Sequence, residues 1–165
     1  MKLRDLLTRL TLATTLAAAP VALPAAIAEE IDNIAFYETT VEADFADIVV
    51  FLEEAVLAEG LVVDYTGHIG DMLARTGPDV GHASPYANAQ YMVFCSAKLT
   101  HGIVAASPEN MAICPYSVYA YELTEAPGDI HVGYRKPIAD TKPASTYALG
   151  EIDKLLRRIV DATVE

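Results

Sequence analysis

The chain has 165 residues and a formal net charge of −12, from 23 Asp and Glu against 11 Lys and Arg. Such an acidic surface repels phosphate backbones, which argues against nucleic acid as a partner and favours cations or a basic protein. The length fits a single domain, and the mean hydropathy of +0.27 is raised by one N-terminal segment.

That N-terminal segment has the order of a secretory signal peptide. Three basic residues within the first nine positions precede an uncharged stretch over residues 10–28, which ends in Ala26-Ile27-Ala28. A basic start, an apolar stretch and small residues before the cleavage point are the three parts of such a signal. We therefore predict a signal peptide over residues 1–28 and export of the remaining chain, with the periplasm as its destination.

A membrane anchor is the alternative interpretation of this segment. Pro20 and Pro24 argue against it, because each removes a backbone donor from an apolar helix. The segment is also rich in Ala and Thr and falls short of about 20 strongly apolar residues. We expect no stable membrane span after cleavage.

The first half of the remaining chain alternates between strand and helix signals. Residues 33–41 alternate in polarity, which predicts a strand. Apolar residues at helical spacing over residues 45–56, after an acidic start and before Gly60, predict an amphipathic helix. A β-branched run at 61–66 predicts a second strand, and 71–76 a short helix that stops at Gly77-Pro78.

The second half begins with a predicted strand over residues 89–97 and a brief helix over 99–106. The longest strand signal follows at 111–123, and a turn at 126–129 leads into a strand over 130–135, antiparallel to it. After a proline-containing linker over 137–143, Ser145 is the predicted cap of a last amphipathic helix.

These elements follow the order β-α-β-α-β-α-β-β-α. Helices beside a mainly antiparallel sheet of about five strands are typical of the α+β class, in two layers with the helices packed on the sheet. No repeat, low-complexity tract or second domain interrupts residues 29–165, which we interpret as one domain.

Two cysteines, Cys95 and Cys114, carry the only thiol chemistry in the sequence. Both fall in predicted strands. In an exported protein a disulfide between them is one expectation, and a metal or reactive-thiol site and a pair of inert buried thiols are the others. A disulfide needs Cα atoms within about 7 Å of each other, which spacing along the chain does not decide.

Further soft or borderline donors come before the cysteines. His68 and Met72 are four residues apart, so on a helix they project from one face. An imidazole with sulfur ligands suits copper, and thiolates also suit zinc or iron. A soft-metal site at His68 and Met72, with Cys95 and Cys114 nearby, is therefore one hypothesis. Taken singly, His68 as a helix-start hydrogen bonder and Met72 as core filler are simpler interpretations. No C-x-x-C-H motif is present, so covalent c-type haem is excluded.

Arg135 stands out because basic residues are scarce here. An arginine directly after a strand tyrosine can hold a carboxylate or sulfate group through two hydrogen bonds, although many such residues only pair with surface acids. Tyr116, Tyr119 and Tyr121 form an aromatic run, of which Tyr119 and Tyr121 share one strand face. We take Cys95, Cys114, Arg135 and Tyr116 as candidate ligand-binding residues. No hydrolase, zincin, Walker or dinucleotide motif occurs, and no catalytic residue is singled out.

Four segments together resemble one known family. They are Val63 to Gly77 (VDYTGHIGDMLARTG), Phe94 to Leu99 (FCSAKL), Asn110 to Glu122 and Gly133 to Pro137 (GYRKP). Their order and spacing resemble the domain-of-unknown-function 302 family, with its exported proteobacterial branch as the nearest pattern. The resemblance implies a small α+β domain that forms homodimers. It implies no activity, and it marks His68, Met72, Cys95 and Cys114 as the positions to test. His101 departs from the basic residue common there.

Three functions remain open at this stage. The first is a non-enzymatic binding protein for a soft metal, haem or a small sulfur-containing ligand. The second is a structural or interaction protein braced by a Cys95–Cys114 disulfide, and the third is a thiol-based redox protein. We rank them in that order.

Overall fold

A six-stranded sheet forms the centre of the protein, and every neighbouring pair of its strands is antiparallel. The computed structural model describes residues 30–138 and 142–165. The strand order across the sheet is β1-β2-β6-β5-β4-β3. The strands are β1 (Glu30–Asp32), β2 (Phe36–Glu42), β3 (Tyr65–Gly67), β4 (Tyr86–Phe94), β5 (Tyr116–Leu123) and β6 (Ala126–Arg135). The predicted signal peptide and part of the linker lie outside the described residues.

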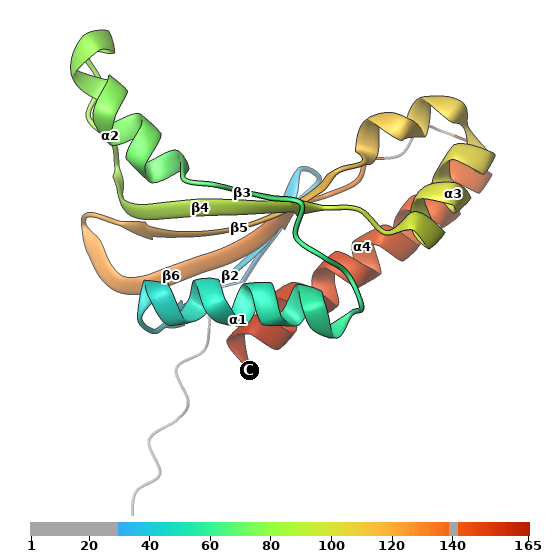
Figure 1. Ribbon diagram of the computed structural model, residues 1–165, viewed down its shortest axis with the longest axis horizontal. Coiled ribbons are helices and arrows are strands. Elements are labelled where there is room, and N and C mark those ends of the chain that lie inside the picture. The colour runs from blue at the N-terminus through green and yellow to red at the C-terminus, as the bar shows by residue number, and fades with distance from the viewer. Residues whose placement is uncertain (1–29, 139–141) are drawn as a thin grey trace, which may run out of the picture.

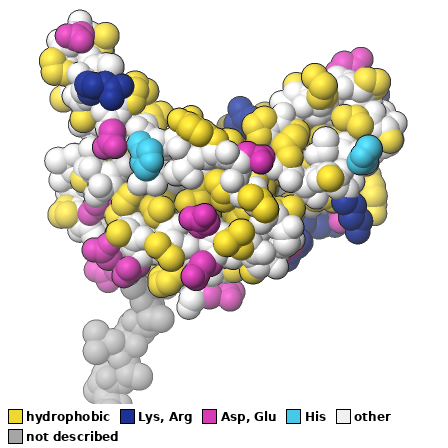
Figure 2. Space-filling view, in the orientation of Figure 1, with side chains coloured by type: hydrophobic (Ala, Val, Ile, Leu, Met, Phe, Trp, Pro, Cys, Tyr) yellow, Lys and Arg dark blue, Asp and Glu magenta, His cyan; other side chains and the backbone are white. Residues whose placement is uncertain are grey.

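The helices divide into a covering layer and two projecting arms. They are α1 (Phe45–Ala58), α2 (Ile69–Val80), α3 (Ala97–Ala106), the 3-10 helix η1 (Pro108–Ile113) and α4 (Pro143–Val164). Helices α1 and α4 pack against each other and against one face of the sheet. Helix α2 contacts β4, and α3 contacts η1 and α4. Helix α2 projects from one end of the molecule, and α3 with η1 projects from the other (Figure 1). The surface is hollowed between the two arms (Figure 2). The predicted α+β class is confirmed.

One row of paired residues shows why the helix-covered face is the core. Tyr37 on β2 lies opposite Tyr134 on β6, which lies opposite Val118 on β5, which lies opposite Met92 on β4. Each of the four is at most 2% exposed. The hydroxyl groups of Tyr37 and Tyr134 donate to carboxylates on α4, at 3.1 and 3.0 Å. Burying apolar area of this kind is the main stabilising contribution to such a domain.

The amphipathic patterns that predicted α1 and the last helix are confirmed. Helix α1 begins where predicted, because the Asp44 side chain accepts a hydrogen bond from the Ala46 amide at 2.8 Å. The predicted core positions of α4 are all buried: Leu149, Ile152, Leu156, Ile159 and Val160. The alternation in β2 is also confirmed, since Tyr37 and Thr39 face the helices while Phe36 and Glu38 face away.

Two predicted boundaries before β4 are wrong. Helix α2 passes Pro78 and ends at Val80, with Gly81 in the left-handed region at φ 72°. A proline this close to the end of a helix removes only one backbone donor, so it does not stop the helix at once. The predicted strand at 61–66 is reduced to Tyr65–Gly67, although the Asp64 amide still donates to the Val93 carbonyl at 2.8 Å.

Two later predictions also need correction. The first part of the predicted strand over 111–123 belongs to η1, and β5 begins only at Tyr116. Ser145 is not a helix cap: α4 begins at Pro143, and the Ser145 hydroxyl is buried and accepts a hydrogen bond from the Asn110 side chain at 3.0 Å. That contact ties α4 to η1. None of the described helices is long and apolar enough to cross a membrane.

Candidate functional site

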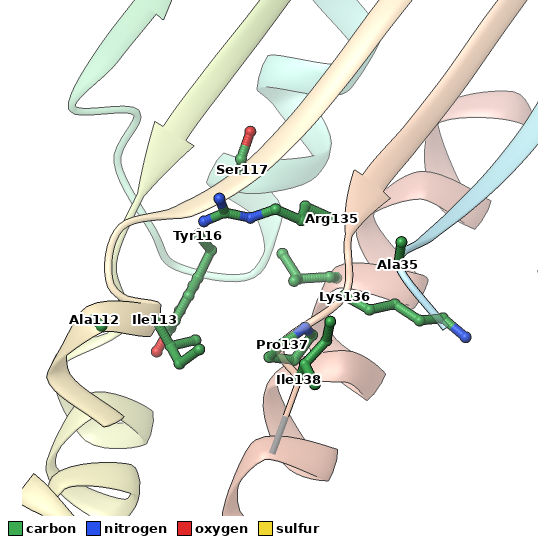
Figure 3. A pocket seen from close by; sticks show the side chains of 10 residues that line it. Ala35, Ala112, Ile113, Tyr116, Ser117, Arg135, Lys136, Pro137 and Ile138 are labelled. Atoms are coloured by element: carbon green, nitrogen blue, oxygen red, sulfur yellow. The ribbon is translucent and has the colours of Figure 1, made fainter. Parts of the chain in front are cut away.

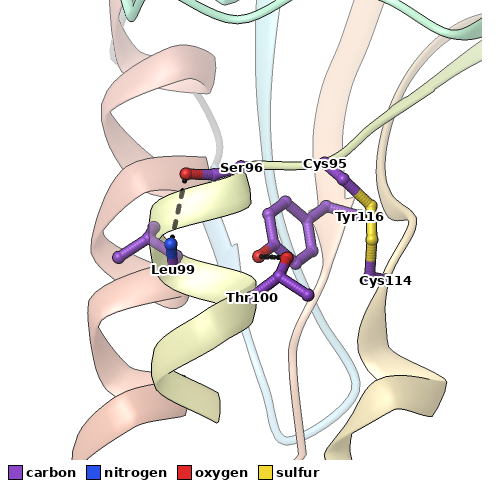
Figure 4. The surroundings of a disulfide bond; sticks show 6 residues. All are labelled: Cys95, Ser96, Leu99, Thr100, Cys114 and Tyr116. Atoms are coloured by element: carbon purple, nitrogen blue, oxygen red, sulfur yellow. Dashed lines mark hydrogen bonds between the residues drawn. A yellow bond between two sulfur atoms is a disulfide. The ribbon is translucent and has the colours of Figure 1, made fainter. Parts of the chain in front are cut away.

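A disulfide joins Cys95 and Cys114 at the end of the sheet (Figure 4). Neither cysteine lies in a strand, contrary to prediction: Cys95 directly follows β4, and Cys114 lies between η1 and β5. Phe94 is paired with Tyr116, so the chain segments just outside this pair meet, and the two Cα atoms are 5.8 Å apart. The described residues contain no free cysteine. The two cysteines are therefore paired in a disulfide, one of the three expectations for them, and neither is a free thiol.

Tyr116 connects the disulfide to α3. Its ring packs edge-on against Phe94, with ring centroids 6.0 Å apart, and its hydroxyl forms a hydrogen bond of 3.1 Å with Thr100. Burial raises the pKa of the Tyr116 hydroxyl above its ordinary value, so the group stays neutral. Ser96 caps α3 by accepting from the Leu99 amide at 3.4 Å (Figure 4). The disulfide thus fixes the start of α3 and the end of η1 against each other.

A pocket of about 310 Å³ opens beside this braced junction (Figure 3). It brings together two of the residues chosen from sequence, Tyr116 and Arg135. The remaining lining residues are Ala35, Ala112, Ile113, Ser117, Lys136, Pro137, Ile138 and Leu156. The lining residues come from η1, the start of β5, the end of β6 and the segment after it, α4, and the residue just before β2. None of the described lining residues is acidic, and most are apolar.

Arg135 is the last residue of β6, and its side chain extends toward β5, where Ser117 and Tyr116 lie (Figure 3). It is exposed and forms no hydrogen bond or ion pair with any described residue. Other cations in this acidic chain do have partners: Arg157 contacts Glu30 at 3.0 Å, and Lys136 contacts Asp32. A guanidinium without a carboxylate partner therefore lies at the mouth of an apolar pocket.

His68 and Met72 lie at the other end of the sheet from the disulfide. His68 precedes α2 as its N-cap residue, and Met72 is 39% exposed on the same helix. Gly67, next to His68, is paired with Tyr91 on β4. Cys95 follows Tyr91 by four residues, which places its Cα about 13 Å from that of Tyr91 at the usual strand rise. Within residues 30–138 and 142–165, no three His, Cys, Asp or Glu side chains are grouped to hold a metal ion. The structure does not bring the four predicted metal donors together.

Sequence reasoning found Arg135 and Tyr116 but missed the apolar part of the pocket. Ile113 is the last residue of η1, although it falls within the strand predicted over 111–123, and Leu156 reaches the pocket from α4. The GYRKP segment was the available signal for the basic side, because it contains both Arg135 and Lys136. No local pattern indicates that η1 and α4 close the opposite side.

Comparison with known proteins supports the fold and supplies no activity. A family model described as "Domain of unknown function DUF302" matches residues 37–164. No curated protein matches the chain. A crystal structure of an uncharacterized conserved DUF302 protein from Bacillus stearothermophilus is similar, with a TM-score of 0.64 and 18% sequence identity. The similarity covers 78% of this chain and 97% of that one, and at this identity it shows the fold alone.

Proposed function

The chain belongs to the DUF302 family, a domain of unknown function, and from its own geometry we propose that it is a non-enzymatic binding protein for a small anionic molecule with an apolar body. The observation that carries this proposal is the unpartnered Arg135 beside an apolar pocket of about 310 Å³. Pockets of this size accept small organic ligands, and a few polar groups within apolar walls set their orientation.

The anionic group is assigned by the chemistry of Arg135. A guanidinium presents a planar fork of donors that matches a carboxylate, sulfonate or sulfate group. Lys136 also lines the pocket, but its side chain extends away from Arg135 and its ammonium pairs with Asp32, so Arg135 is the group that faces an anion (Figure 3). The small sulfur-containing ligand expected from the sequence fits here as a sulfonate or sulfate.

The apolar body is assigned by the rest of the lining. Ile113, Pro137, Ile138 and Leu156 line the pocket, and their contact with a hydrocarbon or ring excludes water from it. Such contact adds affinity and requires no further charge. A ligand with one anionic end and one apolar end therefore fits both Arg135 and the apolar lining.

The other ligand classes have less support. The soft-metal site expected from the sequence has less support, because both cysteine sulfur atoms are held in the disulfide and the other two donors, His68 and Met72, lie away from it. Among the described lining residues, Tyr116 alone is of a type that ligates haem iron, and its hydroxyl is already bonded to Thr100. The disulfide itself serves in this proposal as the brace that holds η1, one wall of the pocket, against the sheet.

Location and assembly enter the proposal from the sequence. We propose that residues 1–28 direct export to the periplasm and that the protein is a homodimer of the exported proteobacterial branch. The basic and apolar order of the leader supports export, and a disulfide is compatible with an oxidising compartment. The resemblance to the family supports the dimer. Mass spectrometry of the secreted chain and light scattering during gel filtration test these two proposals.

Binding is tested with benzoate and benzenesulfonate as probes and benzamide as the neutral control, followed by calorimetry. We expect both anions to bind saturably and benzamide to bind at least tenfold more weakly. Arg135→Ala removes charge-assisted hydrogen bonds worth about 1.5–3 kcal/mol, which lowers the affinity about tenfold to 100-fold. Arg135→Lys restores the charge without the fork and regains only part of the affinity.

Arg75→Ala is the matched control, because this exposed arginine on α2 is outside the pocket. It lowers the net charge by the same amount and should leave anion binding within about twofold. Equal binding of benzamide and benzoate, or unchanged anion binding by the Arg135→Ala protein, would refute the proposal.

A further inference from the structure

The sheet face opposite α1 and α4 contains a buried carboxylate. Glu38 points away from the helices, yet it is only 4% exposed. The side chains that point the same way on the neighbouring strands include Tyr119, Tyr121 and His131. Burying a carboxylate costs free energy unless donors surround it, so the contacts of Glu38 decide what this face can do.

Two tyrosine hydroxyls and one imidazole nitrogen contact the Glu38 carboxylate. The Tyr119 hydroxyl donates to Oε2 at 2.9 Å, and the Tyr121 hydroxyl donates to Oε1 at 3.0 Å. His131 Nδ1 also lies 3.0 Å from Oε1, and its ring stacks on Tyr121 with ring centroids 4.4 Å apart. Burial and the nearby Glu38 charge raise the pKa of both tyrosines, which keeps their hydroxyls as neutral donors. The carboxylate is thereby fixed in place.

Two glycines make room for the rings that surround it. One row across five strands runs Glu38, Gly133, Tyr119, Tyr91 and Gly67. A Cβ atom on Gly133 would lie 2.6 Å from the Tyr119 hydroxyl oxygen, and one on Gly67 would lie 2.2 Å from the Tyr91 ring. Each tyrosine therefore lies flat over a glycine, an arrangement that a side chain at either position would block.

These rings line a second pocket, of about 380 Å³. Tyr86, Tyr91, Tyr119 and Tyr121 surround it, and Glu38 is part of its lining. Phe36, Ala89, Ala120 and Ile69, the first residue of α2, add apolar surface to its walls. This pocket adjoins the Arg135 pocket at Ser117 but has the opposite charge, since its only charged lining residue among those described is Glu38.

From this geometry we propose that the pocket around Glu38 binds a small organic cation, an amine or quaternary ammonium with an apolar or aromatic body. The faces of tyrosine rings carry negative charge density and attract cations within about 6 Å. A carboxylate acts more strongly on a cation at a site from which water is partly excluded. The net charge of −12 draws cations toward the protein from solution. The anion pocket at Arg135 is not needed for this inference.

Benzyltrimethylammonium is the probe, and benzyl alcohol is the neutral control with the same ring. Calorimetry on the protein with its disulfide intact should give saturable binding of the cation and at least tenfold weaker binding of the alcohol. Glu38→Gln should weaken cation binding at least tenfold. Glu42→Gln removes an exposed charge from the same face of the same strand and should change the affinity by less than about twofold.

Tyr86→Leu covers the case in which Glu38→Gln does not fold, because the Tyr86 side chain lies at the pocket without holding the carboxylate. It should weaken cation binding while leaving the unfolding temperature nearly unchanged. Three results would overturn the proposal. They are equal binding of the alcohol and the cation, undiminished cation binding by both variants, and no cation binding at about 10 mM. A second copy or a peptide that covers this face would give that last result. Benzoate binding, measured on the same samples, reports the Arg135 pocket independently.

Discussion

Removing the Cys95–Cys114 disulfide tests whether it is a brace. The cysteines are 19 positions apart, so their bond closes a loop of about 20 residues in the unfolded chain. On the chain-entropy model such a loop contributes about 3 kcal/mol to the free energy of unfolding. We therefore expect the free energy of unfolding of the Cys95→Ser/Cys114→Ser double variant to be about 3 kcal/mol lower than that of the wild-type protein.

Urea denaturation followed by circular dichroism measures this difference. The midpoint should fall in the double variant, while the wild-type protein in strong reductant should match it. A brace also predicts that the folded double variant retains benzoate binding within a few-fold, because Arg135 is on β6 and η1 remains tied to α4 by the Asn110–Ser145 hydrogen bond. A loss below about 1 kcal/mol, or a thiol titration that finds two free thiols in the unreduced protein, would refute this reasoning. A bond reduced readily by glutathione would instead favour the redox function.

Three further predictions concern stability. Gly133→Ala places a Cβ 2.5 Å from the Tyr37 carbonyl oxygen and should lower the free energy of unfolding by about 1–3 kcal/mol. Gly150→Ala in α4 meets nothing within 4 Å and should raise it by up to about 1 kcal/mol. Equal effects of the two variants in urea denaturation would contradict the sheet register. Asp44→Ala removes the cap of α1 and should cost about 1 kcal/mol, which a matched Asp47→Ala control should not reproduce. Arg158 lowers the pKa of the Glu59 carboxyl below 4.5, so their bridge stabilises the fold above that pH and is lost as the pH falls through the lower folded-state pKa. Glu59→Gln should therefore destabilise at pH 7, by less than about 1 kcal/mol, and have no effect near pH 2; the same effect at both pH values would exclude the charge as its cause.

The elements that sequence predicts well are those whose own periodicity decides their burial. Helix α1 and the core face of α4 follow from apolar residues at helical spacing, and β2 follows from its alternation. The elements it misses depend on distant partners. β1 is a three-residue strand that forms only because β2 pairs with it. The last three residues of η1 lie just before the Tyr- and Val-rich run of β5, and nothing in their own pattern separates them from that strand.

The two pockets also differ in how well the sequence predicts them. Arg135 could be identified because basic residues are scarce in this acidic chain and because it lies in the GYRKP segment. Glu38 was not identifiable, because alternation alone does not distinguish a solvated carboxylate from one covered by tyrosines on other strands. Glycine in mid-strand at Gly133 was the available signal, since it commonly marks a close approach. The i, i+4 spacing of His68 and Met72 could not show their distance from Cys95.

Titration of labelled protein with benzoate, followed by NMR, tests the proposed function most directly. The account predicts a saturable shift of the Arg135 Nε–H signal and of the backbone amides of Ser117 and Ile113, which line the same pocket. Benzamide at the same concentrations should leave these signals in place. A benzoate shift that is absent at Arg135, or one that is equally large for residues of α2, would contradict the account.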